Sequence, residues 1–211
     1  MKLFITISII TLLFAGLILI LFPVSWFPHF YDVRYMGLAA IGSAVAIIIL
    51  PRILNALVSA SNDKNKKQAI NLFQFLLIIG IISNALGDLG LYQLYKIGFQ
   101  YDKLIHFSTS LLGVFIGAIV LYKLFEIRLS YAVVFALVAV VVCGAGWEVF
   151  ERISDFLFKT HIVGIYASDV SNDTKFDLLF DAVGAVSGVI LVYYTNIRKR
   201  FVLLDRIMKS I

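Results

Sequence analysis

Long apolar runs separated by short polar connections make up most of the chain. Each run has the roughly 20 residues that an α-helix needs to cross the hydrocarbon core of a bilayer. The pattern predicts an all-α fold, a polytopic membrane bundle of about six transmembrane helices that forms a single domain over residues 1–211. The predicted spans cover residues 3–22, 36–60, 69–94, 104–122, 129–158 and 173–195.

The first span also invites a second interpretation, a cleaved signal peptide. The apolar part of a signal peptide is usually about 7–15 residues long and ends in small residues. This run is longer, and it continues into Phe22-Pro23 and an aromatic segment instead. We therefore expect it to be a membrane helix.

Composition supports the membrane assignment. Hydrophobic residues make up 61% of the chain and charged residues only 15%, whereas soluble domains carry about 25% charged residues. The single Cys143 excludes an intramolecular disulfide. The net charge is +5, but the basic residues lie in short connections and in the C-terminal tail, where they act as topology signals. We expect membrane lipids as partners, and no nucleic acid.

The basic residues also predict an orientation. In a six-span arrangement, twelve of the eighteen fall on the side shared by both termini, which places both termini in the cytoplasm. Ten of the thirteen acidic residues fall toward the opposite side. The acidic positions are therefore predicted to face the extracytoplasmic side.

Several ionisable residues lie inside or at the ends of the last three spans. Burying one in a bilayer costs about 2.5–3.5 kcal/mol on insertion scales, so such residues need partners or a bound cation, and they are often functional. Asp102 and His106 are four residues apart and share one helix face. In chain order the candidates are Asp102, His106, Glu148, Glu151, Asp177 and Asp181.

Glycines continue the faces that carry these acids. Gly113 follows the Asp102 face, Gly144 precedes Glu148 by one turn, and Gly184 follows Asp181. Small residues let membrane helices approach closely. We therefore expect the three acidic ends to meet in one site.

Clustered carboxylates and one imidazole suit a divalent cation such as Mg²⁺, Mn²⁺, Ca²⁺ or Zn²⁺. We expect His106 to act as general base or nucleophile, with Asp102 orienting it. The ligands expected for the cation are Glu148, Glu151, Asp177 and Asp181.

A purely structural interpretation stays open for some of these residues. Asp173 would cap the last helix, and Glu151 would pair with a basic side chain such as Lys103. His29 and His161 lie in boundary segments and are expected to be solvated. The chain contains no H-E-x-x-H, G-x-S-x-G, C-x-x-C or phosphate-binding glycine motif, which excludes several soluble-enzyme classes.

Three stretches carry a family resemblance: D-K-L-I-H-F at 102–107, W-E-V-F-E at 147–151 and D-T-K-F-D-L at 173–178. They resemble the YjdF-type bacterial inner-membrane proteins over about residues 74–194. More distantly, the first stretch and the later Glu and Asp are similar to VanZ-like proteins, although those often have Gln at the position of Glu151. The resemblance implies a multi-pass protein of the bacterial cytoplasmic (inner) membrane that acts on lipids or lipid-linked envelope precursors.

The leading hypothesis is a metal-dependent membrane enzyme. It would hydrolyse or transfer a phosphoester on a lipid or lipid-linked head group at the extracytoplasmic face. A proton- or cation-coupled transporter and a non-catalytic membrane subunit are the alternatives. The inner halves of the last three spans are almost wholly apolar, which favours catalysis or binding over transport.

Overall fold

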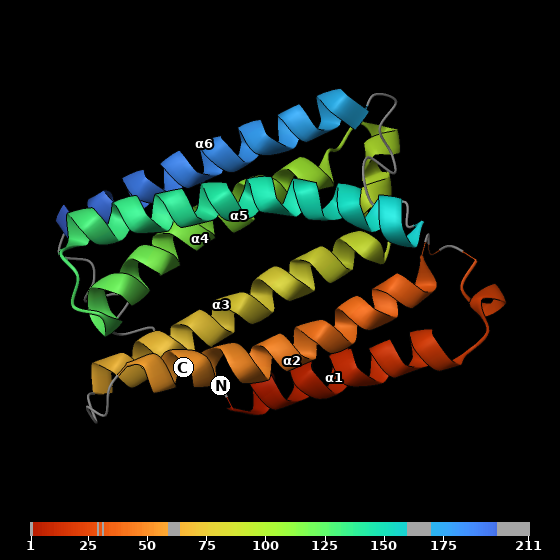
Figure 1. Ribbon diagram of the computed structural model, residues 1–211, viewed down its shortest axis with the longest axis horizontal. Coiled ribbons are helices and arrows are strands. Elements are labelled where there is room, and N and C mark those ends of the chain that lie inside the picture. The colour runs from red at the N-terminus through yellow and green to blue at the C-terminus, as the bar shows by residue number, and fades with distance from the viewer. Residues whose placement is uncertain (1, 29, 31, 59–63, 160–169, 198–211) are drawn as a thin grey trace.

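The computed structural model describes residues 2–28, 30, 32–58, 64–159 and 170–197. These residues form six α-helices and two short 3₁₀-helices, with no β-strand among them (Figure 1). In chain order the elements are α1 (Lys2–Leu21), η1 (Val24–Trp26), α2 (Val33–Leu57), α3 (Lys64–Asp88), η2 (Leu91–Ile97), α4 (Tyr101–Leu124), α5 (Leu129–Phe158) and α6 (Val170–Ile197). All six α-helices contain a stretch long and apolar enough to cross a membrane. The predicted class, a polytopic helical membrane protein, is confirmed.

The helix boundaries agree with the sequence pattern to within three residues except at the two ends of the third span, where α3 begins at Lys64 instead of about Ala69. The pattern extended this helix to about Leu94, whereas α3 ends at Asp88. Gly90 has φ of +134°, a conformation that residues with a side chain rarely adopt, and it separates α3 from η2. Gly98, with φ of +86°, ends η2 in the same way. The chain therefore turns across one end of the bundle just before α4 begins.

Figure 1 shows α1, α2 and α3 on one side of the molecule and α4, α5 and α6 on the other. Helix α4 packs against α3, α5 and α6, so it joins the two groups. One apolar cluster lies between α4, α5 and α6, and its buried residues are Val114, Ala118, Val133, Ala136, Ala185 and Val192. A second lies between α3 and α4, and its buried residues are Ala69, Ile116, Val120 and Leu124.

Glycines allow α4 and α6 to approach closely, as the sequence pattern indicated. A Cβ atom on Gly184 would overlap the carbonyl oxygen of Phe107, and one on Gly188 would lie 2.6 Å from the carbonyl oxygen of Leu111. Gly113 allows α5 to approach α4 in the same way, because a Cβ atom there would lie 2.9 Å from the side chain of Val140. The backbone contact between α4 and α6 therefore depends on the absence of side chains at these positions.

Replacing Gly184 with alanine tests this contact. The added methyl group must push α6 away from the backbone of α4, and overpacking of this kind typically costs about 1–3 kcal/mol. We expect the G184A variant to unfold at a lower temperature in detergent, measured by circular dichroism. Gly146 on α5 is the matched control, because a Cβ there meets nothing within 4 Å. The G146A variant should be as stable as the native protein or more so. Equal melting temperatures for the two variants would contradict the packing argument.

Candidate functional site

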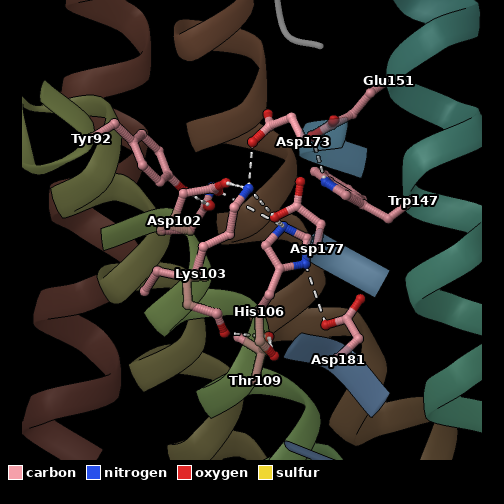
Figure 2. A network of polar contacts seen from close by, with 12 residues as sticks. Tyr92, Asp102, Lys103, His106, Thr109, Trp147, Glu151, Asp173, Asp177 and Asp181 are labelled. Carbon is pink, nitrogen blue, oxygen red and sulfur yellow. Dashed lines mark hydrogen bonds and ion pairs between the residues drawn. The ribbon is translucent and has the colours of Figure 1, made fainter. Parts of the chain in front are cut away.

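The amino group of Lys103 lies at the centre of a buried polar network at the start of α4 and α6 (Figure 2). Its Nζ atom lies 2.5 Å from Oδ1 of Asp173, 2.6 Å from Oδ1 of Asp177 and 2.9 Å from Oδ2 of Asp102. Lys103 is only 7% exposed and Asp177 only 5%. Charges this deeply buried require partners, so a single ammonium group ties two helices together through three carboxylates.

His106 continues the network one turn deeper. Its Nε2 atom lies 3.5 Å from Oδ1 of Asp177 and 3.7 Å from Oδ1 of Asp102, and its Nδ1 atom lies 3.3 Å from Oδ1 of Asp181. Both ring nitrogens thus face carboxylates. Each nitrogen can donate a hydrogen bond to its carboxylate only when it carries a proton. The imidazole therefore lies between two acidic groups, each within 3.5 Å of a ring nitrogen.

Asp181 has one oxygen bound and one free. The hydroxyl group of Ser110 donates a hydrogen bond of 2.7 Å to Oδ1. The other oxygen, Oδ2, is buried and has no hydrogen-bond partner among the described residues. A Cβ on Gly144 would lie 2.6 Å from this oxygen, so the glycine makes room for it. A buried carboxylate oxygen without a partner is costly, and it is available to a ligand that donates a hydrogen bond or carries positive charge.

Helix α5 contributes two glutamates beside this network. Glu148 is 5% exposed, and Arg152 on the same helix donates a 3.4 Å hydrogen bond to the hydroxyl oxygen of Thr174 at the start of α6. Glu151 lies nearer the end of the bundle, where the indole Nε1 of Trp147 donates a 2.7 Å hydrogen bond to Oε1. The acidic stretches of α4 and α6 thus meet through the contacts of Lys103 and His106, and Asp181 also approaches α5 at Gly144, while the roles expected of Glu148 and Glu151 stay predictions.

Helix η2 lies beside the polar end of the site. The hydroxyl group of Tyr92 donates to Asn84 at 2.6 Å, and that of Tyr101 donates to the carbonyl oxygen of Ser83 at 2.8 Å. Burial, with a further contribution from the charge of Asp88, raises the pKa of the Tyr92 hydroxyl above its usual range. Tyr92 therefore stays protonated and remains a donor at physiological pH.

An open cavity of about 1560 Å³ adjoins the network. It is lined by side chains of α2, α3, η2, α4, α5 and the start of α6. Its polar lining includes Asp102, Lys103, His106, Glu151, Asp173 and Asp181. The network therefore faces open space as well as protein.

The charges of the network do not cancel. Four aspartates surround two basic side chains, so negative charge remains even when both bases are protonated. Asp102, His106 and Asp177 each offer a ligand atom, and these atoms lie within 4.8 Å of one another. Lys103 contacts both of these aspartates, so its ammonium group lies among the oxygens that would bind a metal ion. The cation set expected from the sequence, Glu148, Glu151, Asp177 and Asp181, stays a prediction.

Sequence reasoning missed the central role of Lys103 and treated it only as a partner for Glu151. The available signal was a lysine directly after Asp102 in an otherwise apolar helix. The N-cap expected at Asp173 is wrong, because α6 already begins at Val170 and the Asp173 carboxylate binds Lys103. His29 and His161 lie outside the described residues.

Fold and site together define a multi-pass helical membrane protein with a buried acid–base network at one end of the bundle. Residues 9–198 match the family described as predicted membrane protein (DUF2238), and the chain belongs to this family. The match confirms the resemblance to YjdF-type proteins, which form that family, but it does not extend to VanZ-like proteins. No curated protein and no solved structure matched the chain.

Replacing Lys103 with methionine tests the network as a structural element. The variant leaves three carboxylates without their cation, and breaking a buried ion pair from one side costs about 3–5 kcal/mol. We expect the K103M variant to lose stability of this order in detergent, measured by denaturant or thermal unfolding.

The control for this variant is K66M, which removes the 3.6 Å ion pair between Lys66 and the exposed carboxylate of Glu126. Surface pairs contribute about 0–1 kcal/mol, so K66M should hardly change stability. Adding D177N to K103M removes one stranded charge and should restore part of the loss. If K103M were no less stable than K66M, Lys103 would not be the centre of the network.

Proposed function

We propose that this protein is an enzyme of the bacterial inner membrane that hydrolyses or transfers a phosphoester on a lipid or lipid-linked head group at the extracytoplasmic face. The observation that carries the proposal is the acid–base network at the polar end of an otherwise mostly apolar open cavity. A head group is polar and its chains are apolar, so a lipid matches both parts of such a cavity. Intramembrane ionisable groups are functional by default, which supports a role beyond packing.

His106 is the residue that we assign to proton transfer. In hydrolysis, the ring begins with one nitrogen unprotonated, and a proton of the water passes to that nitrogen while the oxygen of the water forms the new bond to phosphorus. The ester bond to phosphorus breaks, and the imidazole returns the proton to the leaving oxygen. Asp102 and Asp181 face opposite nitrogens of the ring and would hold its orientation through this exchange. No step requires a group to move from another helix.

The excess negative charge would repel a phosphate group, so the proposed reaction calls for a divalent cation. Asp102 and Asp177 each offer a carboxylate oxygen that could hold it, with Asp181 Oδ2 as a further free oxygen, and the imidazole of His106 stays available for proton transfer. When bound, such an ion would stabilise the negative charge that develops on the phosphoryl oxygens. It would take the place of the Lys103 ammonium group, since both are positive and share the same oxygens.

A transporter would need a polar path from the network toward the other end of the bundle. Over the described residues, the space between α4, α5 and α6 beyond the network is filled by an apolar cluster that includes Val114, Ala118 and Val192. Each of these three side chains is fully buried. This packing blocks a polar path between α4, α5 and α6, and the cavity that continues along α4 has an apolar lining at Ile116 and Val120, which favours binding or catalysis over ion transport.

The first functional test is lipid turnover by purified protein in vesicles of bacterial phospholipids, followed by mass spectrometry of the extracted lipids. General acid–base catalysis contributes about 10²–10⁴-fold, so the H106Q variant should lower turnover by that factor. The S187A variant is the control, because the exposed hydroxyl group of Ser187 only bonds the carbonyl oxygen of Val183 within α6. Turnover that is equal in H106Q and in the native protein would remove His106 from the mechanism.

The second test concerns the cation. If a divalent ion and the Lys103 ammonium group compete for the same carboxylates, Mn²⁺ should bind more tightly to the K103M variant than to the native protein. At about 100 times its dissociation constant, a ligand stabilises the folded state by about 2.7 kcal/mol. We therefore expect Mn²⁺ to raise the melting temperature of K103M more than that of the native protein. The K103M/D177N variant, which lacks one of these carboxylates, should respond less. Equal responses of all three proteins would argue against a cation at this position.

A further inference from the structure

The cavity next to the network continues as a groove along α4. Helix α3 packs against α2 and α4, and α5 packs against α4 and α6, so α4 forms the floor between two walls. Floor residues include Leu112, Ile116 and Val120, while Leu77 and Val140 line the two walls. The groove is therefore polar at the network and apolar over the rest of its length.

The length of the groove can be compared with the thickness of a membrane. From His106 to Val120 the floor helix rises about 21 Å, at 1.5 Å per residue. One leaflet contributes half of a hydrocarbon core about 30 Å thick, which is about 15 Å. The groove is thus long enough for the hydrocarbon chain of a lipid from one leaflet. The volume of about 1560 Å³ also exceeds the roughly 300–1,000 Å³ of ordinary small-molecule pockets.

We propose that this groove binds the acyl chain of a membrane phospholipid, which enters sideways between α3 and α5 and brings its head group to the network. The proposal rests on the proposed function only for the role of the head group, since chain binding needs no catalysis. The polar end holds more acidic than basic side chains, so it favours a head group that donates hydrogen bonds through an ammonium group. Phosphatidylethanolamine has such a head group and is the probe for the test.

Two glycines provide a matched pair of variants. Gly80 on α3 lines the cavity, and a Cβ built there meets nothing within 4 Å. A phenylalanine at this position would start from open space at its Cβ and would place its ring in the groove. Gly42 on α2 also has nothing within 4 Å, but it is exposed and does not line the cavity. Both substitutions place the same side chain in the interior of a membrane helix, so only the location of the ring differs.

The experiment uses the full-length protein in vesicles that contain phosphatidylethanolamine with a photoreactive diazirine in the middle of one acyl chain. After irradiation, labelled peptides are identified by mass spectrometry. We expect the native protein to be labelled at Leu112 in the groove as well as at exposed residues such as Phe135. In G80F, labelling at Leu112 should fall by about tenfold, as a tenfold loss of affinity would give. Labelling at Phe135 should be unchanged, and G42F should match the native protein at both positions.

Native protein labelled only at exposed residues would overturn the proposal, and this result does not depend on any variant folding. Equal labelling of Leu112 in G80F and G42F would overturn it as well. The H106Q variant separates the two proposals, because it should keep the groove labelling while losing turnover. Groove labelling in a native protein that turns over no lipid would refute the proposed reaction and support the binding groove.

Discussion

The structure depends on one ammonium group buried among carboxylates from two helices. In a bilayer neither the lysine nor the aspartates can be left alone, because water is not available to solvate them. Lys103 therefore fixes the start of α4 against the start of α6, and Asp102 lies in the same contact. The glycines deeper in the bundle bring the same two helices together at the backbone. Polar pairing at one end and close packing along the rest thus support each other, and the cavity beside them is held open by rigid neighbours.

The fold was predictable from the sequence because the apolar runs are long and the breaks between them are polar. The convergence of the acidic stretches was also predictable, since residues four apart share a helix face and glycines mark the side of close approach. This reasoning did not identify Lys103, and the cause is geometric. It follows Asp102 directly, so its Cα lies about 100° around the helix, and face patterns exclude it. Its long side chain still reaches the network. A pattern based on residue spacing alone takes no account of side-chain length. The early end of α3 depends on the positive φ value of Gly90. Hydropathy does not predict backbone conformation, so the sequence pattern did not show where this helix ends.

The site combines a charged network with an apolar groove. The network by itself could be a structural clamp, and the groove by itself could be a packing defect filled by lipid. They are joined in one cavity, with His106 at the boundary between the charged end and the apolar floor. In the proposed reaction, this position would bring the phosphoester of a lipid to His106 while its chain stays in the membrane. Helix α4 carries both His106 and the floor of the groove, so any shift of this helix would alter both together.

The wall of the cavity also contains the single cysteine of the chain. Cys143 lies on α5 directly before Gly144, and it is exposed at the groove. The native protein therefore carries one unique thiol, and the next residue, Gly144, lies against the unpaired oxygen of Asp181. A nitroxide or fluorophore attached there would report on the polarity and occupancy of the groove. For the same reason, thiol-reactive electrophiles dissolved in the bilayer would be expected to reach this wall.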